Sequence, residues 1–130
     1  MYYLVYLSYY RESLEQLVND ITSFKMQNKK HDITGYLLYK DSNILQYIEG
    51  EYDTLMSLYD NIKSDTNHTH ICKILVGKIP DRLYNDWSMD LLVCDDFFPD
   101  SYFVEENYIN GNIKLDKIMK IFIDSKTTIL

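Results

Sequence analysis

The sequence predicts an α+β domain in which two helices cover one face of a single β-sheet. Runs of β-branched and aromatic residues read as strands between turn residues, and two longer stretches between those runs carry apolar residues at helical spacing. The length of 130 residues, with only four glycines and two prolines, suits one core with short connections. The apolar share of 46% and the aromatic share of 15% are typical of globular proteins rather than disordered ones.

The first strand and the first helix follow directly from these patterns. The run "YYLVYLS" (2–8) alternates in strand fashion, and the stretch 11–28 predicts an amphipathic helix. Ser13 and Gln16 form a plausible capping box at the helix start. One face of the strand carries Tyr2, Leu4, Tyr6 and Ser8, and the helix carries an apolar stripe of Leu14, Leu17, Val18, Ile21 and Phe24.

A β-hairpin and a second helix come next. "ITGYLLY" (33–39) is a strand, "KDSN" is a turn, and "ILQYIEG" (44–50) is the returning strand. After Gly50 a helix begins, for which Asp53 is the expected cap. The inner stripe of that helix consists of Leu55, Tyr59 and Ile62.

The rest of the chain predicts two further strands (71–79 and 88–96) and then two C-terminal helices (97–108 and 113–125). The resulting order, β-α-β-β-α-β-β plus two helices, is close to the ferredoxin-like pattern. We expect residues 1–96 to form the main domain. We expect residues 97–130 to form a helical extension that packs on the open face of the sheet or on a partner.

Charge and composition exclude several classes of partner. The net charge of −7, with no long run of Lys or Arg, argues against nucleic acid and favours a protein or a small molecule. No segment is long and apolar enough to span a membrane, and the N-terminus lacks the features of a signal peptide, so we expect a cytoplasmic protein. Cys72 and Cys94 fit neither a metal site nor a disulfide framework and are expected to be buried, reduced thiols.

Gln46 is the residue that does not fit a simple strand. It interrupts an apolar run, and a buried side-chain amide without partners costs about 1–3 kcal/mol. Tyr6 lies in the middle of the first strand, Asn28 closes the first helix, and Trp87 and Met89 stand at the start of the last strand.

Each of these residues also has an ordinary structural interpretation. Tyr6 and Trp87 can be core side chains, Gln46 can point to water from an edge strand, and Asn28 can be a helix C-cap. The three histidines, His31, His68 and His70, are too scattered for a metal site and are expected on the surface or in loops. No phosphate-binding loop, nucleophile elbow or pair of catalytic carboxylates is present in the sequence.

Taken together, these positions resemble the BLUF domain, the FAD-binding sensor of blue light. The resemblance rests on Tyr6 in "LVYLS", Asn28 in "NKKHDITGYLLY", Gln46 in "ILQYIEG" and the "WSM" of residues 87–89. It covers residues 1–96, and the C-terminal helices are typical of the short, single-domain members of the family.

The resemblance implies a flavin between the two helices and a function for the odd glutamine. Gln46 would bridge the flavin to Tyr6, and light would drive an electron and a proton from Tyr6 through Gln46, leaving the amide rotated or in its imidic form. Asn28 would hold the pyrimidine edge of the ring. Trp87 or Met89 would relay the change to the last strand. The remaining cofactor-binding candidates are Ile21 and Ile62 as apolar walls, Lys29 or Lys30 near the phosphates, and His68.

The sequence also departs from the family pattern where cations are usual. Asn67 precedes His68 where arginine is common, and Asn61 replaces a frequent basic residue. FMN or riboflavin are therefore alternatives to FAD.

The resemblance implies a photoreceptor and not an enzyme. No output domain follows residue 130, so we expect the signal to pass to a separate effector protein or through a change in homo-oligomeric state. The alternatives are a ferredoxin-like interaction module without a cofactor and a small flavin-dependent reductase. The absorption spectrum before and after blue light separates all three.

Overall fold

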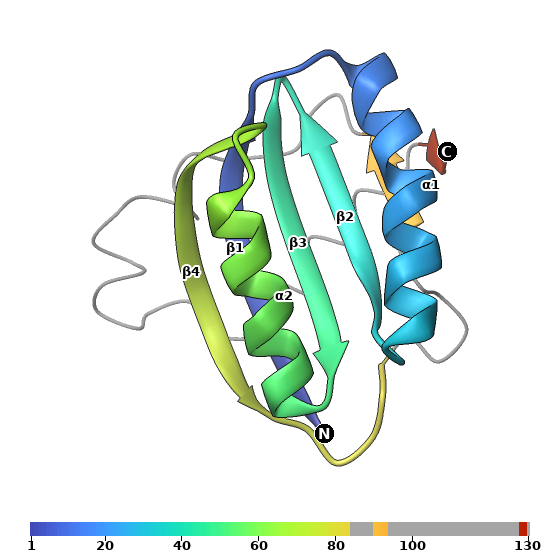
Figure 1. The fold of residues 1–130 in the computed structure, drawn as a ribbon, viewed down its shortest axis with the longest axis vertical. Helices are drawn as coiled ribbons and strands as arrows, with labels where there is room; N and C mark the ends of the chain where they lie inside the picture. Colours follow the sequence, from blue (N-terminus) through green and yellow to red (C-terminus); the bar gives the residue numbers. More distant parts are fainter. Residues whose placement is uncertain (84–89, 94–127, 130) are drawn as a thin grey trace.

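The computed structural model describes residues 1–83, 90–93 and 128–129. Within these ranges the ferredoxin-like order is confirmed (Figure 1). The elements are β1 (Tyr2–Tyr10), α1 (Leu14–Lys30), β2 (Thr34–Lys40), β3 (Asn43–Gly50), α2 (Tyr52–Ser64), β4 (His68–Lys78), β5 (Asp90–Val93) and β6 (Thr128–Ile129). The two predicted C-terminal helices lie outside the described residues.

The sheet has the strand order β4-β1-β3-β2-β5-β6. The first four strands in this order pair antiparallel, whereas β5 lies parallel to β2 at the side remote from β4 (Figure 1). The predicted last strand, 88–96, corresponds to β5, for which four residues are described. Nothing in the sequence patterns predicted β6, because a two-residue strand has no periodicity.

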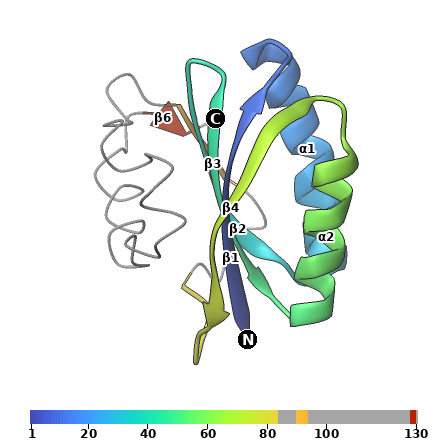
Figure 2. The same cartoon turned by 90° about the vertical axis from the view of Figure 1, so that its left-hand side faces the viewer.

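Both helices pack on the same face of the sheet, as predicted (Figure 2). Alternation along the strands directs every second side chain toward them, so the core lies between the helices and the sheet. Leu17 and Ile21 of α1 and Leu55 of α2 are buried against this face. The strand residues of the same core include Leu4, Tyr6, Tyr10, Leu37, Ile44 and Ile48.

The predicted N-cap is confirmed for α1 and wrong for α2. The Ser13 hydroxyl accepts the N–H of Gln16 at 3.1 Å, which confirms the predicted N-cap of α1. The prediction for Asp53 was wrong: the N-cap of α2 is Glu51, and its side chain makes no capping hydrogen bond. Asp53 lies inside the first turn, where a carboxylate still favours the positive end of the helix dipole.

Asn28 does not close α1, because the helix continues to Lys30 and ends at the C-cap His31. The backbone carbonyl of Asn28 accepts the N–H groups of His31 at 3.2 Å and Ile33 at 2.8 Å. This carbonyl joins the last turn to the start of the hairpin, and the Asn28 side chain itself is buried. The sequence pattern placed Asn28 correctly near the end of the helix, but the C-cap is His31 and not Asn28.

His68 is not a loop residue, as we had expected, but the first residue of β4, which begins before the predicted Ile71. Its ring is buried, and Nδ1 lies 3.0 Å from the Ser8 hydroxyl on β1. His70, by contrast, is exposed and has a φ of 53°, close to a register shift between β1 and β4. This bulge explains why strand periodicity failed over residues 68–70.

The other face of β3 carries a fully buried carboxylate. Glu49 is 0% exposed and accepts hydrogen bonds from the Thr34 hydroxyl at 2.7 Å, the Tyr47 phenol at 2.8 Å and the Leu83 N–H at 2.9 Å. The guanidinium of Arg82 donates to the same Thr34 hydroxyl at 2.8 Å. This network, which we call the Glu49 network, ties the segment after β4 to the hairpin.

The glycine of "ITG" is required by close approach. A Cβ atom at Gly35 would collide with the backbone carbonyl of Tyr47 on the neighbouring strand. Backbone atoms cannot move aside as a flexible side chain can, so the two strands of the hairpin can approach this closely only with glycine at this position.

Candidate functional site

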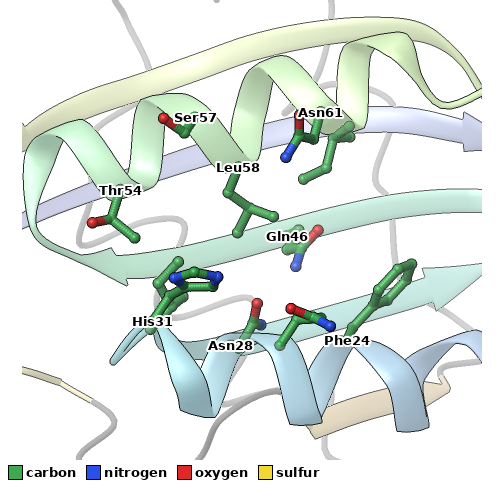
Figure 3. Close-up of a pocket in the computed structure, with 11 residues that line it drawn as sticks. Phe24, Asn28, His31, Gln46, Thr54, Ser57, Leu58 and Asn61 are labelled. Carbon is green, nitrogen blue, oxygen red and sulfur yellow. The ribbon is translucent and has the colours of Figure 1, made fainter.

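A cavity of about 400 Å³ lies between α1 and α2 above the middle of β3 (Figure 3). This volume falls in the range of pockets that bind small molecules and cofactors. Both helices and the strands beneath them contribute side chains, so the fold itself forms the cavity. The lining residues are Phe24, Gln27, Asn28, His31, Ile33, Gln46, Thr54, Ser57, Leu58, Asn61 and Ile62.

Gln46 forms the floor of this cavity, and its position explains why the strand contains an amide. The residue is only 5% exposed and lies directly opposite Tyr6 in the β1–β3 register. The Tyr6 phenol donates a hydrogen bond to Oε1 of Gln46. The amide nitrogen lies toward α1, on the cavity side (Figure 3). The amide therefore joins a buried phenol to a ligand-sized space.

Tyr6 itself does not line the cavity and is 1% exposed. Burial raises the pKa of its phenol well above the usual range, and the nearby Tyr59 and Asp65 add to this effect. Tyr6 is therefore a neutral phenol at every physiological pH. Any interaction between its hydroxyl and a ligand in the cavity has to pass through Gln46.

The walls of the cavity combine amides with apolar side chains. Asn28 on α1 is 4% exposed, and Asn61 stands across from it on α2 (Figure 3). The apolar part consists of Phe24, Ile33, Leu58 and Ile62. Such a set fits a flat ring that has apolar faces and a hydrogen-bonding edge, and the isoalloxazine ring of a flavin has this chemistry.

Four of the predicted cofactor-binding residues do not line the cavity. Ile21 is 3% exposed and packs in the main core, so Phe24, one turn later on α1, lines the cavity instead. Lys29 is exposed and does not line the cavity, and neither does Lys30. His68 lies behind Tyr6, with 6.5 Å between the ring centroids. The proposed relay residues, Trp87 and Met89, lie outside the described residues.

The sequence analysis also missed a polar face of α2. Thr54, Ser57 and Asn61 are spaced at three and four residues and line the cavity from α2 (Figure 3). The same helical period had been used to find the apolar stripe, so these side chains were detectable as a second, polar stripe. Thr54 and Ser57 offer hydroxyl groups, and none of the residues lining the cavity is Lys, Arg, Asp or Glu.

The described residues contain neither a metal cluster nor a membrane-spanning helix. No group of three or more His, Cys, Asp or Glu side chains in residues 1–83, 90–93 and 128–129 is arranged to hold a metal ion. Over the same ranges, none of the helices has both the length and the apolar character needed to cross a bilayer. The side chains of Cys72 and Cys94 are not among those described.

Two relatives are similar to part of this chain. The blue light- and temperature-regulated antirepressor BluF of Escherichia coli (strain K12) is 28% identical over 90 residues, which are 68% of this chain and 22% of that protein. The photoactivated adenylate cyclase subunit beta of Euglena gracilis is 30% identical over 64 residues, 48% of this chain and 8% of that protein. This chain thus spans about a fifth of the first relative and less of the second.

Solved structures agree with this similarity. The dark-state structure of BlrB, a BLUF protein, superimposes with a TM-score of 0.68 at 29% identity over 71% of each chain. The photo-activated state of BlsA gives a TM-score of 0.72 over 98% of this chain and 95% of that one, and at 21% identity it supports the fold alone. The family model for sensors of blue light using FAD matches residues 1–90. With the flavin-sized cavity and the buried Tyr6–Gln46 pair, this match shows that the chain belongs to the BLUF family of blue-light sensors.

Proposed function

We propose that the cavity between α1 and α2 holds the isoalloxazine ring of a flavin and that Tyr6 and Gln46 form its light-driven switch. The observation that carries this proposal is the hydrogen bond from the buried Tyr6 phenol to an amide in the cavity wall. Asn28 would pair with the polar edge of the ring from α1. Ile62, with Phe24 and Leu58, would contact its apolar faces.

A bound flavin that absorbs blue light supplies a strong one-electron oxidant. Tyr6 begins as a neutral phenol, and an oxidised phenol is a strong acid. Loss of an electron from Tyr6 therefore drives its proton along the existing hydrogen bond to Oε1 of Gln46. Once Oε1 carries a proton it no longer accepts from Tyr6, so the amide rotates, or it takes its imidic form if one Nε2 proton passes to an acceptor on the ligand in the cavity. Gln46 then presents a different set of donors and acceptors to the cavity.

The form of the flavin follows from the charge of the cavity. None of the eleven described residues that line it is Lys or Arg, and Lys29 and Lys30 are exposed and do not line it. Hydroxyl and amide groups of Thr54, Ser57 and Asn61 suit a ribityl chain better than a diphosphate. We therefore propose that FMN and riboflavin bind about as well as FAD.

The output is proposed to pass to a separate effector protein, with a change in homo-oligomeric state as the alternative. The printed names of the relatives connect their light sensing to an antirepressor and to an adenylate cyclase. Trp87 and Met89 remain the proposed relay. Met89→Ala should leave the flavin spectrum responsive to light while reducing any light-dependent change in assembly size, measured by analytical ultracentrifugation. An undiminished change in assembly size would remove Met89 from the relay.

The test is the absorption spectrum of the flavin-loaded protein before and after blue light. The parent chain should show a reversible red shift. Tyr6→Phe should bind flavin but show no reversible shift, because the phenolic proton is gone, and Gln46→Leu should also fail to switch because an alkyl chain neither donates nor accepts. Tyr6→Phe keeps the ring volume, so its stability should change by only about 1 kcal/mol.

Matched controls exist for both variants. Tyr9→Phe removes an exposed phenol from the same strand, and Gln27→Leu removes an exposed amide at the cavity. Both should switch normally. A normal reversible shift in Tyr6→Phe or Gln46→Leu would show that the assigned switch is wrong. A colourless protein after purification and addition of flavin would favour an interaction module, and light-independent oxidation of NADH would favour a reductase.

A further inference from the structure

Tyr10, another buried tyrosine of β1, is hydrogen-bonded to a carboxylate, whereas Tyr6 is hydrogen-bonded to an amide. Tyr10 is 1% exposed, and its phenol donates a hydrogen bond to Oδ2 of Asp20 on α1. The other oxygen of that carboxylate accepts the side-chain N–H of Gln16 at 2.9 Å. Tyr10 is thus a buried phenol with a carboxylate already in place to accept its proton, whereas the hydroxyl of Tyr6 donates to a neutral amide.

The difference between these two proton acceptors decides which of the two tyrosines forms the more stable radical. An oxidised phenol must lose its proton, and a carboxylate is a far stronger proton acceptor than an amide oxygen. The neutral tyrosyl radical is therefore easier to form at Tyr10, next to Asp20, than at Tyr6, next to Gln46. Burial and the Asp20 carboxylate both raise the pKa of Tyr10, so its proton is present before any oxidation.

The two phenols lie close enough to exchange an electron. Tyr6 and Tyr10 are on the same face of β1, about 13 Å apart between Cα atoms at the usual rise of a strand. The buried ring of His68 lies between them, with its centroid 6.5 Å from that of Tyr6 and 5.5 Å from that of Tyr10, edge-on in both contacts. Packed aromatic rings therefore connect the two residues without intervening solvent.

We propose that Tyr10 and Asp20 form a second redox station, to which the oxidised state of Tyr6 moves. This inference rests on the proposed function, because the photoexcited flavin is the oxidant that first takes one electron from Tyr6. Tyr10 gives one electron to the Tyr6 radical, and the phenolic proton of Tyr10 passes to Oδ2 of Asp20. The proton held by Gln46 returns to the Tyr6 oxygen. The net change is one electron and one proton lost by Tyr10, the proton gained by Asp20 and the electron held by the flavin.

The experiment is electron paramagnetic resonance of the FMN-loaded chain, frozen during blue illumination. The parent chain should show a tyrosyl radical. Tyr10→Phe should reduce that signal at least fivefold. Asp20→Asn should reduce it at least threefold, because an amide keeps a hydrogen-bond acceptor for Tyr10 but removes the base. Tyr6→Phe should also abolish the signal, since the oxidised state enters at Tyr6.

The control variant is Tyr59→Phe, which removes another tyrosine ring near Tyr6, at 5.9 Å between centroids. Its radical signal should equal that of the parent chain. Melting curves of the flavin-free variants, followed by circular dichroism, report whether each is folded and separate a missing radical from a missing fold. Tyr10→Leu serves as a second variant should Tyr10→Phe fail to fold.

The flavin spectrum of the same samples distinguishes a failure of the Tyr10 proposal from a failure of the proposed function. A normal reversible red shift together with a radical signal that survives Tyr10→Phe, or that Asp20→Asn leaves unchanged, overturns the Tyr10 station and leaves the proposed function standing. A parent chain without any light response overturns the proposed function and the station with it.

Discussion

Replacing Glu49 tests whether the Glu49 network holds the hairpin to the segment that follows β4. Its carboxylate is fully buried and accepts three hydrogen bonds, from Thr34, Tyr47 and Leu83, at 2.7–2.9 Å. Glu49→Ala leaves these three donors without their acceptor in a buried site. Hydrogen bonds to a charged group contribute about 1.5–3 kcal/mol each, and breaking a buried charged network costs about 3–5 kcal/mol in all.

We therefore expect Glu49→Ala to lower the free energy of unfolding by about 3–5 kcal/mol, the magnitude of the whole network rather than the sum of its bonds. For a domain of this size the melting temperature should fall by roughly 10–20 °C. Urea and thermal unfolding followed by circular dichroism measure both quantities. Glu49→Gln should cost less, about 1–3 kcal/mol, because one amide oxygen still accepts while the amide nitrogen meets a donor.

Tyr47→Phe is the matched control for this series. It removes one donor and leaves the carboxylate with two partners, so its cost should be about 1 kcal/mol. In the double variant with Glu49→Ala, Tyr47→Phe should cost less than it does alone, since the phenol has already lost its acceptor. A loss below 1 kcal/mol for Glu49→Ala, or full additivity of the pair, would refute this account of the network.

Three further predictions concern the cavity and its surroundings. Asn28→Ala should weaken FMN binding by about 1–2 kcal/mol, roughly 5- to 30-fold in Kd by fluorescence titration, and unchanged affinity would contradict its role. FAD, FMN and riboflavin should bind the flavin-free chain with Kd values within about threefold, because phosphates gain little from a described lining without Lys or Arg. A tenfold preference for FAD would refute this. Burial lowers the pKa of His68, so the unfolded chain binds a proton that the folded chain does not. Stability should therefore be constant above about pH 6.5 and fall as the pH drops below it, and His68→Gln should flatten that slope in urea titrations.

Much of the architecture could be read from local patterns. Alternation in "YYLVYLS" and helical spacing from Leu14 to Phe24 report which face of an element is buried, and that property is set mainly by neighbours in sequence. The hairpin, the first helix and the start of the second helix were therefore predicted close to their observed positions. The predictions fail at ends and irregularities of the elements. Asp53 is not the N-cap of α2. His68 belongs to β4 and not to a loop, which the sequence pattern misses because the bulge near His70 breaks the alternation.

The sequence also pointed to Gln46, because an amide interrupted an apolar strand, and the resemblance to the BLUF domain added Tyr6 and Asn28. It could not show that Ile21 turns into the core while Phe24 faces the cavity. These residues lie one turn apart on one stripe, and only the position of α2 and β3 separates them. The same holds for Glu49, whose neighbours in space come from β2 and from the segment after β4.

What the sequence by itself determined is therefore the order of the elements from β1 to β5 and the unusual side chains, because each depends on short-range periodicity and on the chemistry of single residues. The tertiary structure alone decided that Tyr6 donates to Gln46 across the β1–β3 register and that Tyr10 meets Asp20 on α1. Both contacts join separate elements. The first depends on the pairing of β1 with β3, and the second depends on how α1 packs on the sheet. Packing of that kind is a property of the whole chain and leaves no local signature in the sequence.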